Sequence, residues 1–95
     1  MKDIVERFKT YIAIDTKSDE SSTTIPSTPG QLELGRLLVN ELKELGLENA
    51  KQDEHGYVYA TLKSNIQKEV PSIGFIGHMD TSPDLDGKCT NPKIF

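Results

Sequence analysis

Apolar residues recur at helical spacing in the first part of the chain. Ile4, Phe8 and Ile12 follow one another every four residues, which places them on one face of a helix. Asp3 precedes them and has an acid three residues later, a pair that can satisfy the free N–H groups of a first turn. The pattern predicts a helix near residues 3–14 with its apolar face in the core.

A second, longer helical pattern follows a polar stretch. Thr28 and Pro29 are typical of an N-cap and a first helical position, and Gly46 is typical of a left-handed helix end. Between them runs a leucine stripe with a charged opposite face. We predict a helix near residues 29–45, packed through the leucines at positions 34, 38, 42 and 45.

Three β-like segments come next. Residues 50–53 and 57–62 flank Gly56, whose freedom to adopt positive φ suits a hairpin turn. Residues 72–77 are apolar with small glycines between, as in a strand buried in a sheet. The polar residues 15–28 between the two helices read as a surface loop.

These elements predict an α/β fold in which two helices pack on a small mixed sheet. Helix and strand faces of this kind are stable only when they cover each other. The predicted core comprises Ile4, Phe8, Ile12, Leu34, Leu38, Leu42, Leu45, Val58, Ile73 and Phe75.

Composition narrows the classes of function. A net charge of −4 argues against nucleic acid, whose phosphates require clustered Lys and Arg. No apolar run approaches the ~20 residues of a membrane span, so we expect no membrane partner. The charged start of the chain is unlike a secretory signal, and the single cysteine, Cys89, cannot form a disulfide framework. Both observations favour the cytoplasm.

The candidate chemistry lies where the segment 72–77 ends. His78 and Asp80 follow it, and in open α/β sheets ligands collect beyond the carboxyl ends of strands. In an extended backbone, residues two apart point the same way and lie about 6.6–6.8 Å apart, so both can face one cleft. Neutral imidazole binds zinc well, and a nearby acid commonly fixes its orientation.

At this point the chain resembles a known family of dizinc metallopeptidases. The resemblance rests on the order Gly77-His78-Met79-Asp80-Thr81-Ser82-Pro83-Asp84, with further similarity in residues 6–8, 26–28, 30–31, 54–62, 87–88 and 91–92. It implies a site with two zinc ions, in which His78 is a zinc ligand and Asp80 is the catalytic acid that orients its neighbours. The extension Thr81-Ser82-Pro83-Asp84 resembles the branch of aminopeptidases that remove the N-terminal residue from tripeptides, so a short peptide is the expected substrate.

Enzymes of this family are much longer than 95 residues. We therefore expect residues 1–95 to be the N-terminal fragment of a catalytic domain, a view that the apolar ending Ile94-Phe95 supports. The general base and the remaining zinc ligands are then expected beyond Phe95. Since a catalytic zinc site usually has three protein ligands, we expect the fragment by itself to be inactive.

Several alternatives remain open. The chain could be a small non-catalytic α/β binding or interaction module, or belong to a deacylase or carboxypeptidase of the same zinc family. Asp84 reads more readily as a turn acid than as a ligand, His55 as an exposed turn residue, and Cys89 as a bystander.

Truncation has a further consequence for the segment 72–77. If it is central in the native sheet, its backbone edge and its apolar side chains lie open in the fragment. We therefore expect the fragment to self-associate through this segment or through Ile94 and Phe95.

Overall fold

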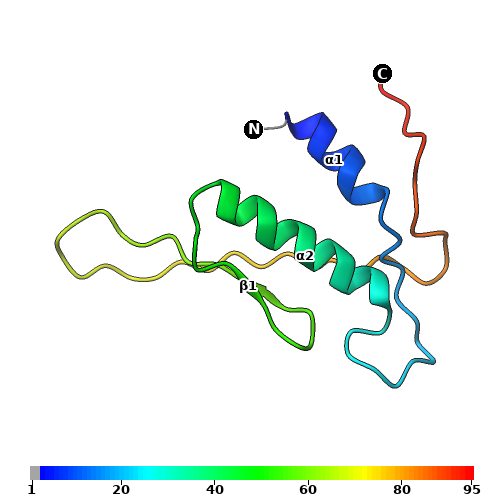
Figure 1. The fold of residues 1–95 in the computed structure, drawn as a ribbon, viewed down its shortest axis with the longest axis horizontal. Coiled ribbons are helices and arrows are strands. Elements are labelled where there is room, and N and C mark those ends of the chain that lie inside the picture. The colour runs from blue at the N-terminus through cyan, green and yellow to red at the C-terminus, as the bar shows by residue number, and fades with distance from the viewer. Residues whose placement is uncertain (1–2) are drawn as a thin grey trace.

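The computed structural model describes residues 3–95, which form two helices and a short hairpin. The helices are α1 (Ile4–Ile12) and α2 (Pro29–Glu44), and the strands are β1 (Lys51–Gln52) and β2 (Val58–Tyr59). Figure 1 shows α1 beside the longer α2, with the hairpin on the other side of α2. The α/β class and both predicted helices are confirmed, although α1 ends two residues and α2 one residue earlier than predicted.

Helix α1 begins at the cap that the sequence indicates. The side chain of Asp3 accepts a hydrogen bond of 2.8 Å from the backbone N–H of Glu6. Its apolar face is open, however, because Ile4 and Phe8 are 82% and 57% exposed. The prediction that they belong to the core is wrong for residues 3–95, since nothing in this part of the chain covers that face of α1.

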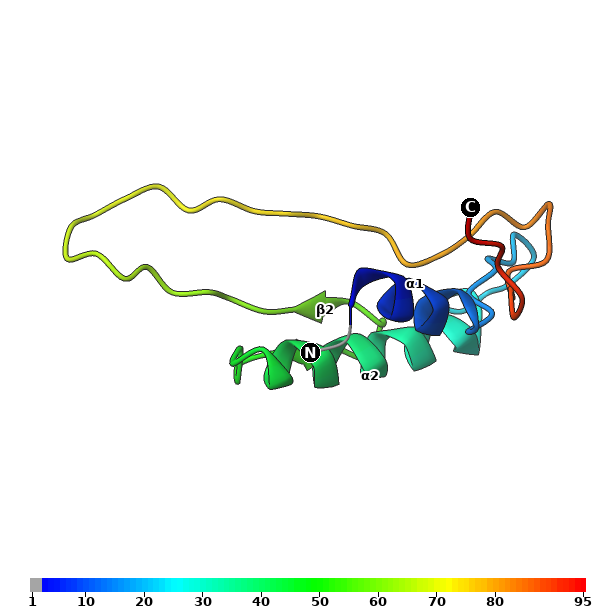
Figure 2. The ribbon, with the colours of Figure 1, turned by 90° about the horizontal axis from the view of Figure 1, so that it is seen from above.

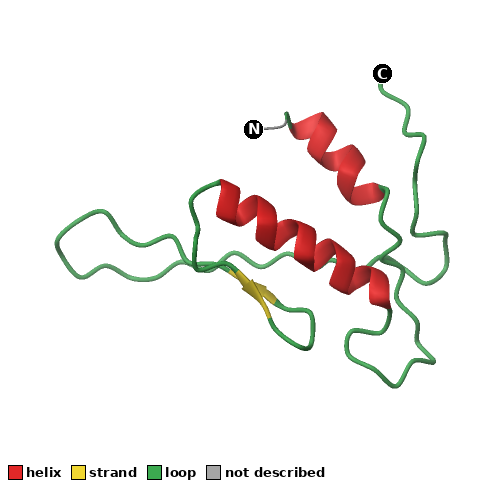
Figure 3. Cartoon of the chain, viewed as in Figure 1, coloured by secondary structure: helices red, strands yellow, loops and turns green. Residues whose placement is uncertain are grey.

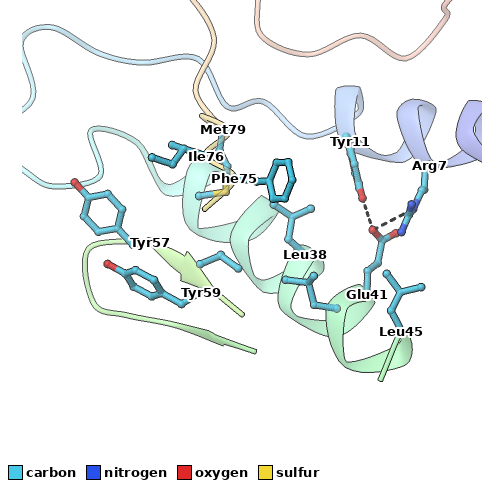
Figure 4. Close-up of a pocket in the computed structure, with 13 residues that line it drawn as sticks. Arg7, Tyr11, Leu38, Glu41, Leu45, Tyr57, Tyr59, Phe75, Ile76 and Met79 are labelled. Atoms are coloured by element: carbon cyan, nitrogen blue, oxygen red, sulfur yellow. Dashed lines mark hydrogen bonds and ion pairs between the residues drawn. The ribbon is translucent and has the colours of Figure 1, made fainter. Parts of the chain in front are cut away.

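A polar cluster joins α1 to α2. The hydroxyl of Tyr11 donates a hydrogen bond to Glu41 Oε2, and Arg7 Nε lies 3.6 Å from the same oxygen. Figure 4 shows both side chains reaching from α1 to Glu41 on α2. Burial, followed by the hydrogen bond to Glu41 and the charge of its carboxylate, raises the pKa of Tyr11 above its ordinary value.

Helix α2 starts where the sequence predicts and ends one residue earlier, and its cap differs. Thr28 has an extended backbone and Pro29 occupies the first turn, yet the Thr28 hydroxyl donates to the carbonyl of Lys17 at 2.8 Å and does not cap the helix. Gly46 ends the helix with φ of +96°. Leu34 is buried and Leu38 and Leu42 are half-buried, whereas Leu45 is exposed.

The hairpin packs on α2 through its first strand. β1 and β2 are antiparallel, with Lys51 opposite Tyr59 and Gln52 opposite Val58, and Gly56 takes φ of +85° in the turn. The side-chain amide of Gln52 donates to the carbonyl of Leu32 at 3.2 Å. This close approach requires Gly35, because a Cβ there would stand 2.1 Å from Gln52 Nε2.

The segment 72–77 is not a strand in this structure. It runs extended and apart from α2 and the hairpin in Figure 2 and is drawn as loop in Figure 3, and its backbone makes no hydrogen bond within residues 3–95. Ile73 and Phe75 are 81% and 95% exposed, so the prediction that they are core residues is wrong for this length of chain. The reason is physical: a strand exists only with a partner, and none of the described residues supplies one.

The buried core is accordingly small. Leu34 and Ala50 are its buried apolar residues, while Ile12 and Val58 of the predicted core are half-buried. The sheet that forms is antiparallel, and parallel pairing is limited to one isolated bridge between Lys17 and Thr81. Within residues 3–95, neither helix has the length and apolar character needed to cross a bilayer.

The raised pKa of Tyr11 predicts a loss of stability in alkali. An unfolded tyrosine loses its proton near pH 10, whereas folded Tyr11 keeps its proton to higher pH. Above about pH 10 the folded state thus binds more protons than the unfolded state, so the free energy of unfolding should fall as pH rises through this window. Urea unfolding at several alkaline pH values should show this fall in the wild-type chain and a shallower one in Tyr11→Phe. Tyr57→Phe, which leaves the Tyr11–Glu41 contact in place, should retain the wild-type slope, and an equal slope in Tyr11→Phe would contradict the assignment.

Candidate functional site

His78 and Asp80 form a local pair at the end of the extended segment. His78 Nδ1 lies 2.9 Å from the carbonyl oxygen of Asp80 and 3.2 Å from its carboxylate Oδ1. Both oxygens can only accept, so Nδ1 carries the proton in this hydrogen bond. In the neutral imidazole Nε2 then keeps its lone pair, and the side chain is 85% exposed. The arrangement presents one metal-binding nitrogen in a fixed tautomer.

The next residue anchors this pair to the loop that precedes α2. The Thr81 N–H donates to the carbonyl of Thr16 at 3.1 Å, and the Thr81 carbonyl accepts from the Ser18 N–H and hydroxyl, both at 3.0 Å. These bonds form the parallel bridge centred on Lys17. Residues 16–18 therefore position the backbone directly after Asp80.

The anchoring loop is held in turn by close backbone approaches. A Cβ at Gly30, in the first turn of α2, would lie 1.7 Å from the carbonyl oxygen of Asp15. A Cβ at Gly87 would lie 2.4 Å from Asp15 Oδ1 and 2.8 Å from Lys17 N. Only glycine fits at positions 30 and 87 without displacing the loop. Residues 15–17 are therefore held between the first turn of α2 and the backbone at Gly87.

Buried polar groups fix the same loop. Thr16 and Gln31 are 4% and 7% exposed, and the Gln31 amide donates to the Thr16 carbonyl at 3.4 Å and to the Ser27 hydroxyl at 3.2 Å. Both acceptors of the Gln31 amide therefore lie in the loop before α2. The role of Gln31 is to tie α2 to the loop that carries the Thr81 anchor.

A hollow of about 360 Å³ opens beside His78 and Asp80. It is also lined by Pro26, Gln31 and His55, which belong to the loop before α2, to α2 and to the hairpin turn. The sequence indicates His55 as an isolated turn residue, whereas the structure places it at the same hollow as His78. No local signal could reveal this, because the hollow is lined by segments that are far apart in the sequence.

The other candidate residues have local roles. The Asp84 carboxylate accepts from the Ser82 hydroxyl at 3.2 Å, and Asp84 N donates to that hydroxyl at 3.3 Å, which fits the interpretation of a turn acid. Cys89 is free and exposed, and its backbone N–H donates to the carbonyl of Ile12 at 2.7 Å. His55 Nε2 lies 3.6 Å from Glu54, its neighbour in the turn.

These side chains do not make a complete metal site. Across residues 3–95, no three His, Cys, Asp or Glu side chains are grouped so that they could hold one metal ion. A catalytic zinc usually has three protein ligands at about 2.0–2.3 Å. His78 fits such a site as one ligand, with Asp80 behind it, and the other ligands would have to come from elsewhere.

Comparison with known proteins identifies relatives along nearly the whole chain. Peptidase T of Clostridium perfringens strain 13 is 58% identical over 94 residues, which are 99% of this chain and 23% of that protein. Peptidase T of Bacillus subtilis strain 168 is 58% identical over 93 residues, and that of Clostridium botulinum strain 657 is 60% identical over 94 residues. The chain thus spans about a quarter of the length of these curated relatives. No family model matches the chain.

The close approach at Gly30 predicts that the anchor is sensitive to one added methyl group. Gly30→Ala should lower the free energy of unfolding by about 1–3 kcal/mol, because Asp15 must move away. Gly74→Ala is the matched control, since its Cβ would meet no atom within 4 Å, and it should leave stability unchanged or raise it by up to about 1 kcal/mol. Urea unfolding of the two variants measures the difference. Equal stabilities would show that residues 15–17 are not clamped.

Proposed function

We propose, since the chain is homologous to peptidase T over nearly its whole length, that it forms the N-terminal part of a dizinc aminopeptidase acting on tripeptides. The identity of 58–60% to three such proteins supports the peptidase assignment. The zinc ions and the tripeptide substrate are supported by the motif from Gly77 to Asp84 and its resemblance to the dizinc family.

One observation carries the assignment of roles within the chain. His78 directs its Nδ1 proton at Asp80 and leaves Nε2 open, which is the arrangement in which an acid fixes the tautomer of a metal-binding histidine. His78 is therefore the proposed zinc ligand. Asp80 is the proposed acid of the site, which orients the imidazole through the same hydrogen bond.

In the proposed reaction, residues of this chain hold the His78 imidazole in position. Zinc ions, when bound, provide Lewis-acid activation of water and of the scissile carbonyl. Asp80 holds the proton on His78 Nδ1, and the bond from Thr81 to Thr16 fixes the backbone that carries both side chains. The hollow beside them, lined in part by His55, is the proposed site of approach for a short peptide. The remaining ligands and the general base are assigned to the part of the protein that this chain does not span.

Rival functions account for fewer of these features. A non-catalytic module gives no reason for an imidazole with a fixed tautomer and a free nitrogen on an exposed segment. A deacylase or carboxypeptidase of the same zinc family would share His78 and Asp80, but the named relatives above are all peptidase T. The free, exposed cysteine fits the reducing cytoplasm, which is the proposed location.

The isolated 95-residue chain should have no measurable aminopeptidase activity and only weak zinc affinity. It offers one ligand where a catalytic site needs about three, and it lacks the general base. Incubation with a tripeptide and zinc, followed by detection of the released N-terminal amino acid, tests this. Release by the wild-type chain that is lost in His78→Ala would show that the site is already complete within 95 residues.

A chimera tests the proposed roles in a full-length setting. In it, this chain replaces the 93 matched residues of Bacillus subtilis peptidase T. His78→Ala should lower tripeptide hydrolysis at least about 100-fold, with loss of bound zinc, and Asp80→Asn about 10- to 100-fold, because the imidazole loses its orienting partner. His55→Ala is the matched histidine control and should keep its zinc content. Full zinc and activity in His78→Ala would refute the assignment.

A further inference from the structure

His55 has an imidazole at the hollow beside His78 and Asp80 that the fold itself does not use. The side chain is 54% exposed, and its ring nitrogens form no hydrogen bond with any of residues 3–95. The carboxylate of Glu54 lies 3.6 Å from Nε2, which is longer than an ordinary hydrogen bond. The imidazole is therefore free to bind a ligand that enters the hollow.

The turn that carries His55 is held by four hydrogen bonds. The carboxylate Oδ1 of Asp53 accepts from the backbone N–H of His55 at 3.0 Å and from that of Tyr57 at 2.9 Å. The Asp53 N–H donates to the carbonyl of Tyr57 at 3.0 Å, and the Asp53 carbonyl accepts from the Gly56 N–H at 3.1 Å. With its backbone fixed, His55 has only its side-chain torsions to order when a ligand binds, which keeps the entropic cost of binding small.

The same turn packs on the part of α2 that also positions the candidate metal ligand. A Cβ at Gly56 would lie 3.4 Å from Leu32 Cδ2, in the first turns of α2. Gln31, the neighbour of Leu32, donates to the carbonyl of Thr16, which accepts from the Thr81 N–H as well. The two histidines of the chain are therefore placed by one region of the fold.

Charges around the hollow favour a cationic ligand. Asp80 is the one acid among its lining residues, and none of them is Lys or Arg. Asp53 and Glu54 directly precede His55. A carboxylate would be repelled there, whereas an ammonium group would be attracted. Glu54 also favours the neutral tautomer with the proton on Nε2, and in that tautomer Nδ1 is an acceptor for an N–H donor.

We infer that His55 binds the N-terminal residue of the peptide substrate, with Nδ1 accepting a hydrogen bond from the α-ammonium group. The inference rests on the proposed function, because an aminopeptidase holds its substrate by a free N-terminus. A hollow of about 360 Å³ is at the small end of ligand sites, which suits one end of a peptide. Further lining residues offer apolar contact to the N-terminal side chain; they are Ile25, Pro26, Ile76 and Met79.

The chimera with Bacillus subtilis peptidase T allows a test by steady-state kinetics. His55→Phe keeps a planar ring without an acceptor, so it should raise the KM for trialanine about 10- to 100-fold, as expected for loss of a hydrogen bond to a charged group. The kcat should stay within about threefold and the zinc content should not change, because the bond is present before and during the reaction. His55→Asn, whose Oδ1 can accept in place of Nδ1, should keep the KM within about threefold of wild type. A wild-type KM in His55→Phe would overturn the inference.

An analogue without the amino group identifies the atom that His55 binds. Propionyl-dialanine is trialanine in which a hydrogen atom replaces the ammonium group. As a competitive inhibitor it should bind wild type and His55→Phe equally, within about twofold, because the bond to Nδ1 is absent in both complexes. If its inhibition constant rose as much as the KM for trialanine, His55 would bind another part of the peptide and the assignment would be wrong.

The outcomes separate this inference from the proposed function. Hydrolysis by His55→Phe with wild-type kinetics supports the function and overturns the role of His55. A wild-type chimera that hydrolyses no trialanine counts against the function, and calorimetric titration with trialanine then tests the hollow by itself. In that case wild type should bind trialanine at least about tenfold more tightly than His55→Phe does. Equal binding, or no binding by either, would contradict the inference.

Discussion

The bridge between Thr81 and residues 16–18 is the constraint on which the candidate site depends. After residue 62, the described chain forms backbone-to-backbone hydrogen bonds with earlier elements only through Thr81 and Cys89. His78 lies three residues before this bridge, so its position follows from where Thr81 is held. That position follows in turn from the loop at 15–17, which Gly30 and Gly87 approach too closely for any side chain. A surface histidine is thus placed by contacts made at the first turn of α2.

The sequence predicts those parts of the structure whose causes are local. Helix α1 begins at Ile4, after its cap Asp3, and α2 begins at Pro29, because caps and periodicity act within a few residues. The hairpin forms around Gly56 for the same reason. The pairing of His78 with Asp80 is also local, since only Met79 separates the two residues. The bridge to Thr16 and the approach of His55 are not local. They depend on packing between segments far apart in sequence, and no spacing rule encodes them.

The strand predicted at residues 72–77 does not form, and the cause here is different. Their composition is that of a buried strand, and the structure keeps them extended. Composition describes the environment for which a segment is suited, whereas a strand also needs a neighbour that supplies hydrogen bonds. Complete burial of exposed side chains such as Ile73, Phe75 and Ile76 would each stabilise the protein by about 1.5–3 kcal/mol. Packing of this segment against a partner would therefore be favourable. The same reasoning explains why Ile4 and Phe8 look like core residues and lie open.

The unpaired backbone of residues 72–77 bears on the proposed role of His78 as a metal ligand. A productive metal site needs its ligands fixed within about 0.5 Å, and such precision comes from rigid elements. His78 is held on one side by the bridge at Thr81, but on the other side it continues into a segment without hydrogen bonds. Pairing of residues 72–77 would fix the backbone on both sides of the imidazole at once. Pairing of this segment and organisation of the proposed zinc ligand would then occur together.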